Sequence, residues 1–207
     1  FRFDDYKIVE GGKMDKFVWD KYSSNTELLL RRVGEIRARL SLRAPSSNYS
    51  DSDIQPKRKR IIESFKKKFD PDSDYEQSKR IRFDFQNGRK AAILTSKRYE
   101  PGIGPGDYWY GYTRSVRTHL SESSGLTDYF IMGFMDRDVA LAVPFEVIES
   151  IKDNLNITQN DDGTISKWHI NILEAEKNNE YRIKLKGGAT IDGLAYVDFS
   201  NYVFKLN

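Results

Sequence analysis

The chain has 207 residues, no cysteine, 38% hydrophobic and 31% charged residues, and a formal net charge of +3. This hydrophobic share excludes a fully disordered chain, and no apolar run approaches the roughly 20 residues that a membrane-spanning helix needs. The absence of cysteine excludes disulfides and thiolate metal sites, which favours an intracellular location, cytoplasmic if the source is bacterial. The chain begins with Phe1 rather than methionine, which indicates a fragment of a larger protein.

The first part of the chain predicts two amphipathic helices separated by a polar segment. Residues 26–44 have apolar side chains at helical spacing, namely Leu29, Val33, Ile36 and Leu40. Residues 46–55 are small, polar and acidic, which is typical of a linker or long loop. A second helix is expected from Pro56, with an apolar stripe of Ile61, Ile62, Phe65 and Phe69. We therefore expect an N-terminal segment (1–45), the linker, and a main domain (56–207).

After Asp70 the pattern changes from helical to alternating, which predicts strands. Asn87-Gly88 lies between two of them and is a strong signal for a two-residue hairpin turn. The predicted strands cover residues 80–86, 89–96, 108–113, 129–134, 139–143, 168–175, 180–186 and 195–204. Two short helices are expected, at 114–120 and 145–155. The predicted fold class is α+β, a bent sheet or pseudo-barrel of seven to eight strands with two short helices, preceded by the two amphipathic helices.

The small net charge hides an uneven distribution along the chain. Residues 56–98 contain 14 Lys and Arg against 6 Asp and Glu, whereas residues 121–165 contain 2 against 9. Such a basic cluster favours a phosphate-rich partner. The alternative is that these cations form solvated faces balanced by the acidic half. The candidate phosphate-binding residues in the cluster are Lys57, Arg58, Lys59, Arg60, Arg82, Arg89, Lys90, Lys97 and Arg98.

An aromatic segment follows the glycine-rich residues 101–107. In a strand, Tyr108, Tyr110 and Tyr112 share one face and Trp109 points to the other, so one face is core and the other partly exposed. Exposed tyrosines beside Arg114 and Arg117 would suit the stacking of an unpaired base. Ordinary cross-strand packing is the alternative, because tyrosine is a favoured strand residue.

Motifs for catalysis and metal binding are weak. Residues 101–107 lack the Gly-Lys-Ser/Thr ending of a phosphate-binding loop and predict a stiff surface turn. Two histidines, His119 and His169, and no cysteine make a zinc site hard to assemble. The acidic series from Asp70 lacks the glycine and the bidentate glutamate of a calcium loop. We therefore expect no metal site and no cofactor.

A divergent PD-(D/E)XK-like nuclease is the enzymatic alternative, and it would use Mg²⁺. Such a centre needs an Asp on one strand and an acid two residues before a Lys on the next. Asp84 and Lys97 supply two of these groups as candidate catalytic residues, but Thr95 stands where the second acid belongs. The missing carboxylate weakens this alternative.

A resemblance covers residues 107–196, less than half of the chain. It rests on Tyr108-Trp109-Tyr110-Gly111, Asp128-Tyr129-Phe130-Ile131-Met132-Gly133, Val143-Pro144-Phe145-Glu146, Lys167-Trp168-His169-Ile170 and Leu185-Lys186-Gly187-Gly188. This succession resembles domains of bacterial restriction-modification and phage-defence proteins. The resemblance implies DNA as the partner, with either a B3-like pseudo-barrel that reads DNA or a divergent nuclease core. It transfers no catalytic or base-contacting residue.

The leading hypothesis is a DNA-recognition module of a larger restriction or defence-type protein. Its basic cluster would bind phosphates, and the strand from Tyr108 to Arg117 would contact bases. RNA is the second nucleic acid considered, and other domains or subunits of the parent protein are expected partners, whereas a membrane is not. The alternatives are the nuclease and a scaffold domain that docks another subunit through acidic residues 121–165.

Overall fold

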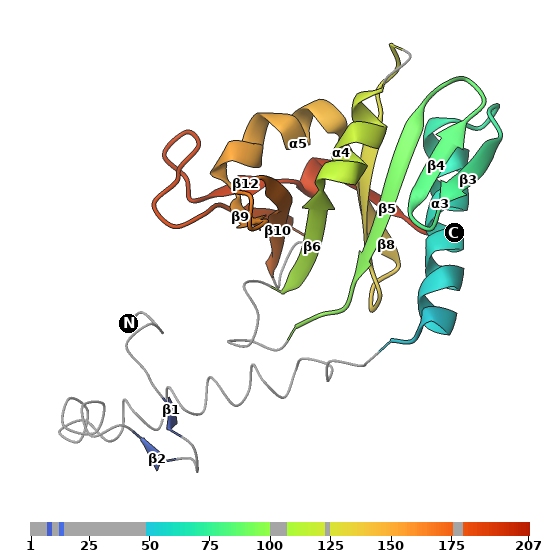
Figure 1. The fold of residues 1–207 in the computed structure, drawn as a ribbon. Helices are drawn as coiled ribbons and strands as arrows, with labels where there is room; N and C mark the ends of the chain where they lie inside the picture. The colour runs from blue at the N-terminus through green and yellow to red at the C-terminus, as the bar shows by residue number, and fades with distance from the viewer. Residues whose placement is uncertain (1–7, 10–12, 15–48, 100–106, 123–124, 176–179) are drawn as a thin grey trace. The chain divides into compact units, whose positions relative to one another are not determined.

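The computed structural model describes residues 8–9, 13–14, 49–99, 107–122, 125–175 and 180–207, drawn in colour in Figure 1. Contacts between residues divide the chain into two compact units, residues 1–45 and 46–207, and each is described by itself. In the first unit, β1 (Ile8–Val9) and β2 (Lys13–Met14) form an antiparallel pair. The helix predicted for residues 26–44 lies outside the described residues.

The second unit is α+β, as predicted, but its strands form two open sheets, so the predicted closure into a pseudo-barrel is wrong. The six-stranded sheet has the order β13-β8-β7-β5-β4-β3, with β3 (Tyr75–Lys79), β4 (Arg82–Phe85), β5 (Lys90–Ser96), β7 (Tyr129–Phe134), β8 (Val139–Pro144) and β13 (Val203–Lys205). The five-stranded sheet has the order β12-β11-β10-β6, and β9 also pairs with β10. Its strands are β6 (Tyr108–Thr113), β9 (Asn156–Gln159), β10 (Ile165–Ala175), β11 (Glu180–Lys184) and β12 (Tyr196–Asp198).

Three α-helices accompany these sheets among the described residues: α3 (Asp51–Phe69), α4 (Arg114–Ser121) and α5 (Phe145–Ile151). Two 3₁₀ turns, η2 (Lys152–Asn154) and η3 (Ser200–Tyr202), complete the elements. No helix in the described part of the chain is both long enough and apolar enough to cross a membrane.

Helix α3 begins at Asp51, earlier than predicted. Ser50 is its N-cap, and the Asp53 carboxylate accepts a hydrogen bond from the Ser50 amide at 2.8 Å, which completes a capping box. Residues 51–55, the second half of the predicted linker, therefore form the first turns of the helix. Pro56 lies within the helix rather than at its start.

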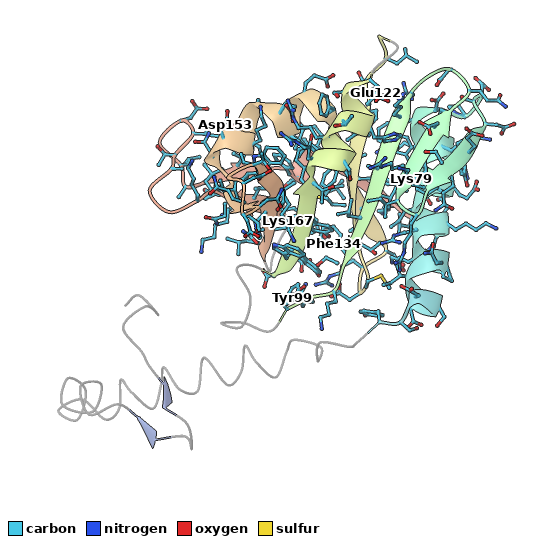
Figure 2. The ribbon with its side chains drawn as sticks, viewed as in Figure 1. Lys79, Tyr99, Glu122, Phe134, Asp153 and Lys167 are labelled. Carbon is cyan, nitrogen blue, oxygen red and sulfur yellow. The ribbon has the colours of Figure 1, made fainter. Side chains whose placement is uncertain are left out.

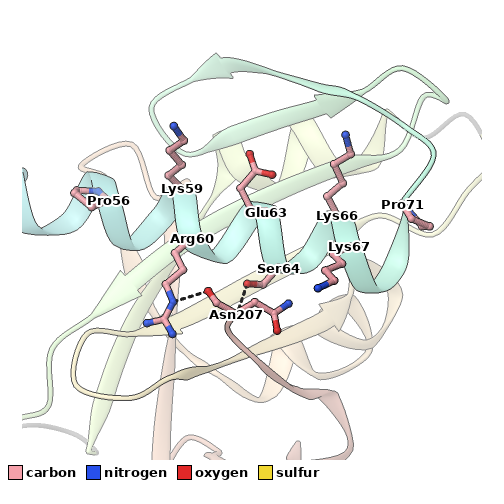
Figure 3. A pocket seen from close by; sticks show the side chains of 9 residues that line it. All are labelled: Pro56, Lys59, Arg60, Glu63, Ser64, Lys66, Lys67, Pro71 and Asn207. Carbon is pink, nitrogen blue, oxygen red and sulfur yellow. Dashed lines mark hydrogen bonds between the residues drawn. The ribbon is translucent and has the colours of Figure 1, made fainter.

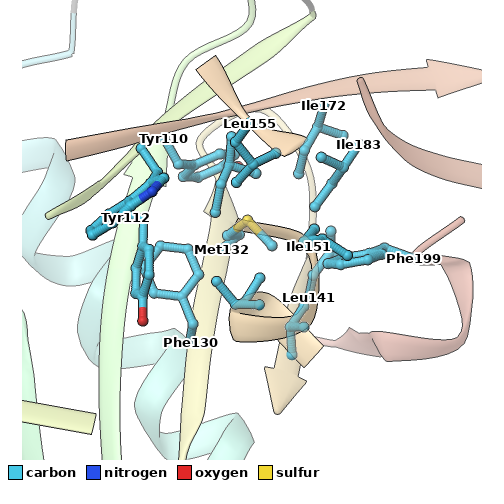
Figure 4. Packing of buried hydrophobic residues seen from close by; sticks show 14 of the residues in the cluster. Tyr110, Tyr112, Phe130, Met132, Leu141, Ile151, Leu155, Ile172, Ile183 and Phe199 are labelled. Atoms are coloured by element: carbon cyan, nitrogen blue, oxygen red, sulfur yellow. The ribbon is translucent and has the colours of Figure 1, made fainter. Parts of the chain in front are cut away.

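The six-stranded sheet lies between α3 on one face and the five-stranded sheet with α4 and α5 on the other (Figure 1). Side chains alternate along β7, so that Ile131 packs against α3 while Phe130 and Met132 enter the larger core (Figure 4). The central strands β5 and β7 are a parallel pair buried on both faces. Helix α3 approaches β7 closely at Gly133, where a Cβ would overlap Ile61 Cδ1.

The hairpin turn at Asn87-Gly88 is one residue longer than predicted. Phe85 N donates to the Arg89 carbonyl at 2.8 Å and Gly88 N donates to the Phe85 carbonyl at 2.9 Å, which defines a three-residue loop. Gly88 has a φ of 90°, but Asn87 does not have the positive φ that a two-residue type I′ turn needs. The Asn87 side chain instead donates to the Asp70 carboxylate at 2.8 Å, which ties the loop to the end of α3.

Most predicted elements occur with small shifts in their bounds. Strands β3 and β9 were not predicted, because each is short and mostly exposed. The predicted strand at 195–204 is interrupted by η3, and its two parts join different sheets as β12 and β13. The helix predicted at 145–155 ends as α5 at Ile151 and continues as η2.

Candidate nucleic-acid interface

The three tyrosines of β6 face the core rather than a partner. Tyr108, Tyr110 and Tyr112 are at most 1% exposed and pack in the larger core, where Figure 4 labels Tyr110 and Tyr112. Tyr110 donates to the Gly133 carbonyl at 3.0 Å and Tyr112 donates to Glu149 at 3.0 Å, so their hydroxyl groups are satisfied internally. Burial raises the pKa of Tyr110 well above its ordinary value. The predicted exposed stacking surface on these tyrosines is therefore wrong.

Trp109 is the aromatic side chain of β6 that points away from this core, and it is partly exposed. Its indole Nε1 donates to His169 Nδ1 at 2.9 Å, and His169 Nε2 lies 2.6 Å from Thr158 Oγ1. The Lys167 ammonium lies 5.8 Å from the centroid of the indole ring. Burial, followed by the Lys167 charge, lowers the pKa of His169, so this imidazole is a neutral acceptor at neutral pH.

Five of the nine predicted phosphate-binding cations pair inside the domain, and so does Arg117, which was predicted to contact bases. Lys57 and Arg60 pair with Asp138, Arg89 with Asp70, Lys90 with Glu122, Arg98 with Asp136 and Glu174, and Arg117 with Glu149. Four of these acids belong to the acidic half of the sequence, so the two halves of the charge pattern neutralise each other. These six cations have internal partners, which makes them weaker candidates for the predicted interface, and residues 121–165 keep less free charge for docking a subunit.

Arg117 contributes to the fold through Glu149. Arg117 donates to both carboxylate oxygens of Glu149 at 2.9 to 3.0 Å, and Tyr112 and Lys152 complete the cluster. Burial alone would raise the pKa of Glu149, but hydrogen bonds from Arg117, Tyr112 and Lys152 outweigh it and hold the pKa below the ordinary 4.5. Because the folded pKa is depressed, this stabilisation is present above the unfolded pKa and is lost as pH falls through the folded pKa.

We expect Glu149→Gln to lower the free energy of unfolding by about 1 to 2 kcal/mol near pH 7, because charge-assisted hydrogen bonds are lost. The difference from the wild type should shrink at about pH 3, where the wild-type carboxylate is increasingly protonated. Urea unfolding at both pH values measures it, with Glu146→Gln on the same helix as an exposed control. A deficit of equal size at both pH values would contradict the assignment.

Seven arginines are partly buried in the described part of the chain: Arg58, Arg60, Arg82, Arg89, Arg98, Arg117 and Arg182. The guanidinium groups of five of them bond a carboxylate or a main-chain carbonyl: Arg60, Arg89, Arg98, Arg117 and Arg182. The structure gives the guanidinium groups of Arg58 and Arg82 no hydrogen bond and no ion pair. A buried donor of a cation without a partner is unfavourable, so Arg58 marks a place where an anion is stabilised, while Arg82 supplies a cation without an ion pair.

Arg58 lines a notch where β5 extends beyond the end of β4. The pairing of β4 with β5 ends at Arg82 opposite Ala92, whereas β5 continues to Ser96. The space beyond β4 is bordered by α3, β5 and β6 and has a volume of about 570 Å³. We call it the notch, and it is lined by Tyr49, Ile54, Arg58, Ile81, Leu94, Thr95, Ser96, Lys97, Tyr99, Trp109, Tyr110, Gly111 and Met135.

The notch combines cations with aromatic side chains. Arg58 Nε and Nη1 and Thr95 Oγ1 are buried without a hydrogen-bond partner. Burial, followed by the charge of Arg80, lowers the pKa of Arg58, although the guanidinium remains a cation at neutral pH. The Lys97 ammonium lies 5.8 Å from the centroid of the Tyr99 ring. None of the thirteen described residues that line the notch is Asp or Glu, so the notch suits an anion.

The two candidate nuclease residues do not come together. Asp84 pairs opposite Lys90 at the hairpin end of β5, and its carboxylate lies 3.7 Å from His119 Nδ1. Lys97 follows the other end of β5, about 23 Å further along an extended strand. No group of three or more His, Cys, Asp or Glu side chains in the described ranges could hold a metal ion. The residues therefore do not fit the Mg²⁺ centre that the nuclease alternative requires.

A second pocket, the α4 pocket, is formed by residues of β3, β4 and α4. It has a volume of about 450 Å³ and is lined by Lys79, Arg82, Arg114, Ser115, Thr118, His119 and Glu122; Figure 2 labels Lys79 and Glu122. Its one carboxylate, on Glu122, accepts a hydrogen bond from Lys90 at 2.9 Å, which leaves the lining positive. Ile81 lines the notch while Lys79 and Arg82 line this pocket, so the β3–β4 turn borders both.

Lys59, the remaining predicted cation of α3, lies in a groove of about 650 Å³ along that helix. Figure 3 shows this α3 groove, which is lined by Pro56, Lys59, Arg60, Glu63, Ser64, Lys66, Lys67, Pro71 and Asn207. Arg60 Nε donates to the Asn207 carbonyl at 2.8 Å, and Asn207 N donates to Ser64 Oγ at 2.9 Å. The α3 groove has mixed charge and no aromatic side chain, so it is a weaker candidate than the notch.

The chain matches no protein-family model, and no curated protein or solved structure is similar enough to match it. Fold and site together define an α+β domain with two open sheets and two basic pockets beside one turn. Sequence reasoning missed Thr95, Tyr99 and Trp109 as neighbours in one site. The only signal was local, since Tyr99 directly follows the pair Lys97-Arg98 at the end of a predicted strand.

Proposed function

We propose that the second unit binds DNA through the two pockets that border the β3–β4 turn. The observation that carries the proposal is that Arg58, which has two buried donor atoms without a hydrogen-bond partner, lines the notch, and that Arg82, which has no ion pair, lines the neighbouring α4 pocket. Guanidinium groups bind phosphate strongly through charge-assisted hydrogen bonds. Two neighbouring anion sites suit a chain of regularly spaced phosphates better than a single small anion.

Further cations support the same surface. Lys97 lies in the notch, and Lys79 and Arg114 lie in the α4 pocket. Phosphate contacts position a nucleic acid without reading its sequence, and RNA carries the same phosphates. The choice of DNA, and of a recognition module within a larger restriction or defence-type protein, rests on the resemblance of residues 107–196.

The salt dependence of binding tests this proposal. Each phosphate contact on duplex DNA contributes a slope of about −0.9 to the plot of log affinity against log salt. We expect Arg58→Gln and Arg82→Gln each to weaken binding and to reduce the magnitude of the slope by about 1. Fluorescence anisotropy with a labelled duplex between about 50 and 200 mM salt measures both quantities.

Lys184→Gln and Lys205→Gln are matched controls, because both lysines are exposed and lie outside the two pockets. They should leave the slope unchanged. Arg58→Gln should not lower the melting temperature, since it removes a partly buried charge that has no partner. Affinity that does not change with salt concentration, or a slope that all four substitutions change equally, would reject the proposed surface.

A further inference from the structure

The notch has a feature that phosphate binding alone does not explain. Unlike the α3 groove and the α4 pocket, it is lined by Tyr49, Tyr99 and Trp109 beside its cations. We propose that the notch holds one unstacked nucleotide of a DNA strand, with the base against the aromatic side chains and the phosphate at Arg58. This inference rests on the proposed function and names the ligand of the same site.

The apolar part of the lining sets the shape of the ligand. Trp109 comes from β6, Tyr99 from the end of β5 and Tyr49 from the segment before α3, so aromatic rings enter the notch from three parts of the fold. Side chains of Ile54, Ile81, Leu94 and Met135 complete an apolar surface. A nucleobase is flat and partly apolar, and bases of any sequence stack on aromatic rings. The volume of about 570 Å³ lies within the usual range for small-ligand sites.

The polar groups of the notch indicate the charge of the ligand and the hydrogen-bonding groups that it needs. Arg58 has two buried donor atoms and Thr95 has a buried hydroxyl, and none of these three atoms has a partner in the fold. A nucleotide supplies both kinds of partner when the Arg58 and Thr95 side chains turn toward it, because its phosphate accepts hydrogen bonds from a guanidinium and its base edge can pair with a hydroxyl. A purely apolar ligand would leave these groups unsatisfied, and a free phosphate would leave the aromatic surface unused.

A base inside a regular duplex cannot enter the notch, because it is stacked and paired. Stacking on the aromatic side chains of the notch therefore requires the base to leave the duplex stack, which is easiest for a bulged or mismatched base. The neighbouring α4 pocket is placed to hold a flanking phosphate, since it borders the same β3–β4 turn. The domain should consequently prefer a duplex with one unpaired nucleotide over the same duplex fully paired.

The test compares two duplexes that differ only by one bulged 2-aminopurine, a fluorescent base whose emission falls on stacking. Fluorescence anisotropy with the full chain gives the affinity for each duplex, and 2-aminopurine emission reports the environment of the base. We expect the wild type to bind the bulged duplex about 10-fold more tightly and to quench the emission, as stacking on an aromatic ring predicts.

Two mild substitutions locate the base. Tyr99→Leu removes a partly exposed ring, and Thr95→Val removes a hydroxyl with little change in shape. Both should abolish most of the preference for the bulged duplex while affinity for the paired duplex stays within about 2-fold. Tyr196→Leu is the matched control, because Tyr196 is also partly buried with a cation over its ring but lies on β12, outside the notch.

The outcomes separate this inference from the proposed function. Equal, salt-dependent affinity for both duplexes would overturn the nucleotide site and leave DNA binding intact. Failure to bind either duplex at about 50 mM salt would reject the proposed function itself. A preference for the bulge that survives Tyr99→Leu and Thr95→Val would place the base elsewhere and overturn the assignment to the notch.

Discussion

Arg98→Ala is expected to lower the free energy of unfolding by about 3 to 5 kcal/mol, because it removes one partner of a buried ion cluster. The Arg98 side chain is 13% exposed and that of Glu174 is 8% exposed. Arg98 also donates to Asp136 and to the Tyr108 hydroxyl, both at 3.1 Å. Without the guanidinium, these acceptors remain in a partly desolvated site, where Arg137 at 2.9 Å is the cation that Glu174 keeps. Urea unfolding near neutral pH measures the loss.

Arg80→Ala is the matched control for this prediction. Arg80 also pairs with a carboxylate, that of Asp51, but the two side chains are 57% and 73% exposed. An exposed pair contributes about 0 to 1 kcal/mol, so the control should be nearly neutral. Adding Glu174→Gln to Arg98→Ala should recover part of the loss, since it removes a buried charge that would have only Arg137 left as a partner. A loss below about 1 kcal/mol for Arg98→Ala would show that the cluster is solvated rather than buried.

The elements that sequence periodicity predicted best are those buried by the fold. Strands β6 and β7 have the predicted bounds, because each is a short run of aromatic and aliphatic residues whose side chains mostly enter a core. Strand β9 (Asn156–Gln159) has little apolar character and is mostly exposed. It is held by main-chain pairing with β10, which leaves no periodic signal in the sequence.

The sequence showed the uneven distribution of charge, but it did not show which charged residues pair with one another. Arg60 pairs with Asp138 across 78 positions of the chain, and Arg98 pairs with Glu174 across 76. Such partners become neighbours only through the order of strands in the sheets, which composition and spacing do not determine. For the same reason, Arg58 could be predicted as one cation of a cluster but not as a cation that lacks a partner.

Alternation along β6 predicted two faces without deciding which one is buried. The face with Tyr108, Tyr110 and Tyr112 carries three large rings, whereas the other face carries Trp109 and Gly111. The larger apolar face enters the core because its burial removes more apolar surface from water. The sequence hypothesis assigned the tyrosines to the partner, and the structure leaves Trp109 as the ring of this strand that is available at the notch.

Tyr110→Ala tests this reassignment directly. The side chain is 1% exposed, so its removal leaves a large cavity and should lower the free energy of unfolding by about 3 to 5 kcal/mol. Tyr110→Phe keeps the ring but leaves the Gly133 carbonyl without its donor, and should cost about 1 to 2 kcal/mol. Urea unfolding of both variants gives these values.

Tyr110→Phe should lose affinity for bulged and paired duplexes in equal proportion, because it keeps the ring that borders the notch and changes only the folded fraction. Affinities corrected for the folded fraction should therefore match the wild type, in contrast to Tyr99→Leu, which should alter the ratio without a comparable loss of stability. If Tyr110→Phe is as stable as the wild type but has lost its preference for the bulged duplex, the tyrosine face of β6 is part of the binding surface after all.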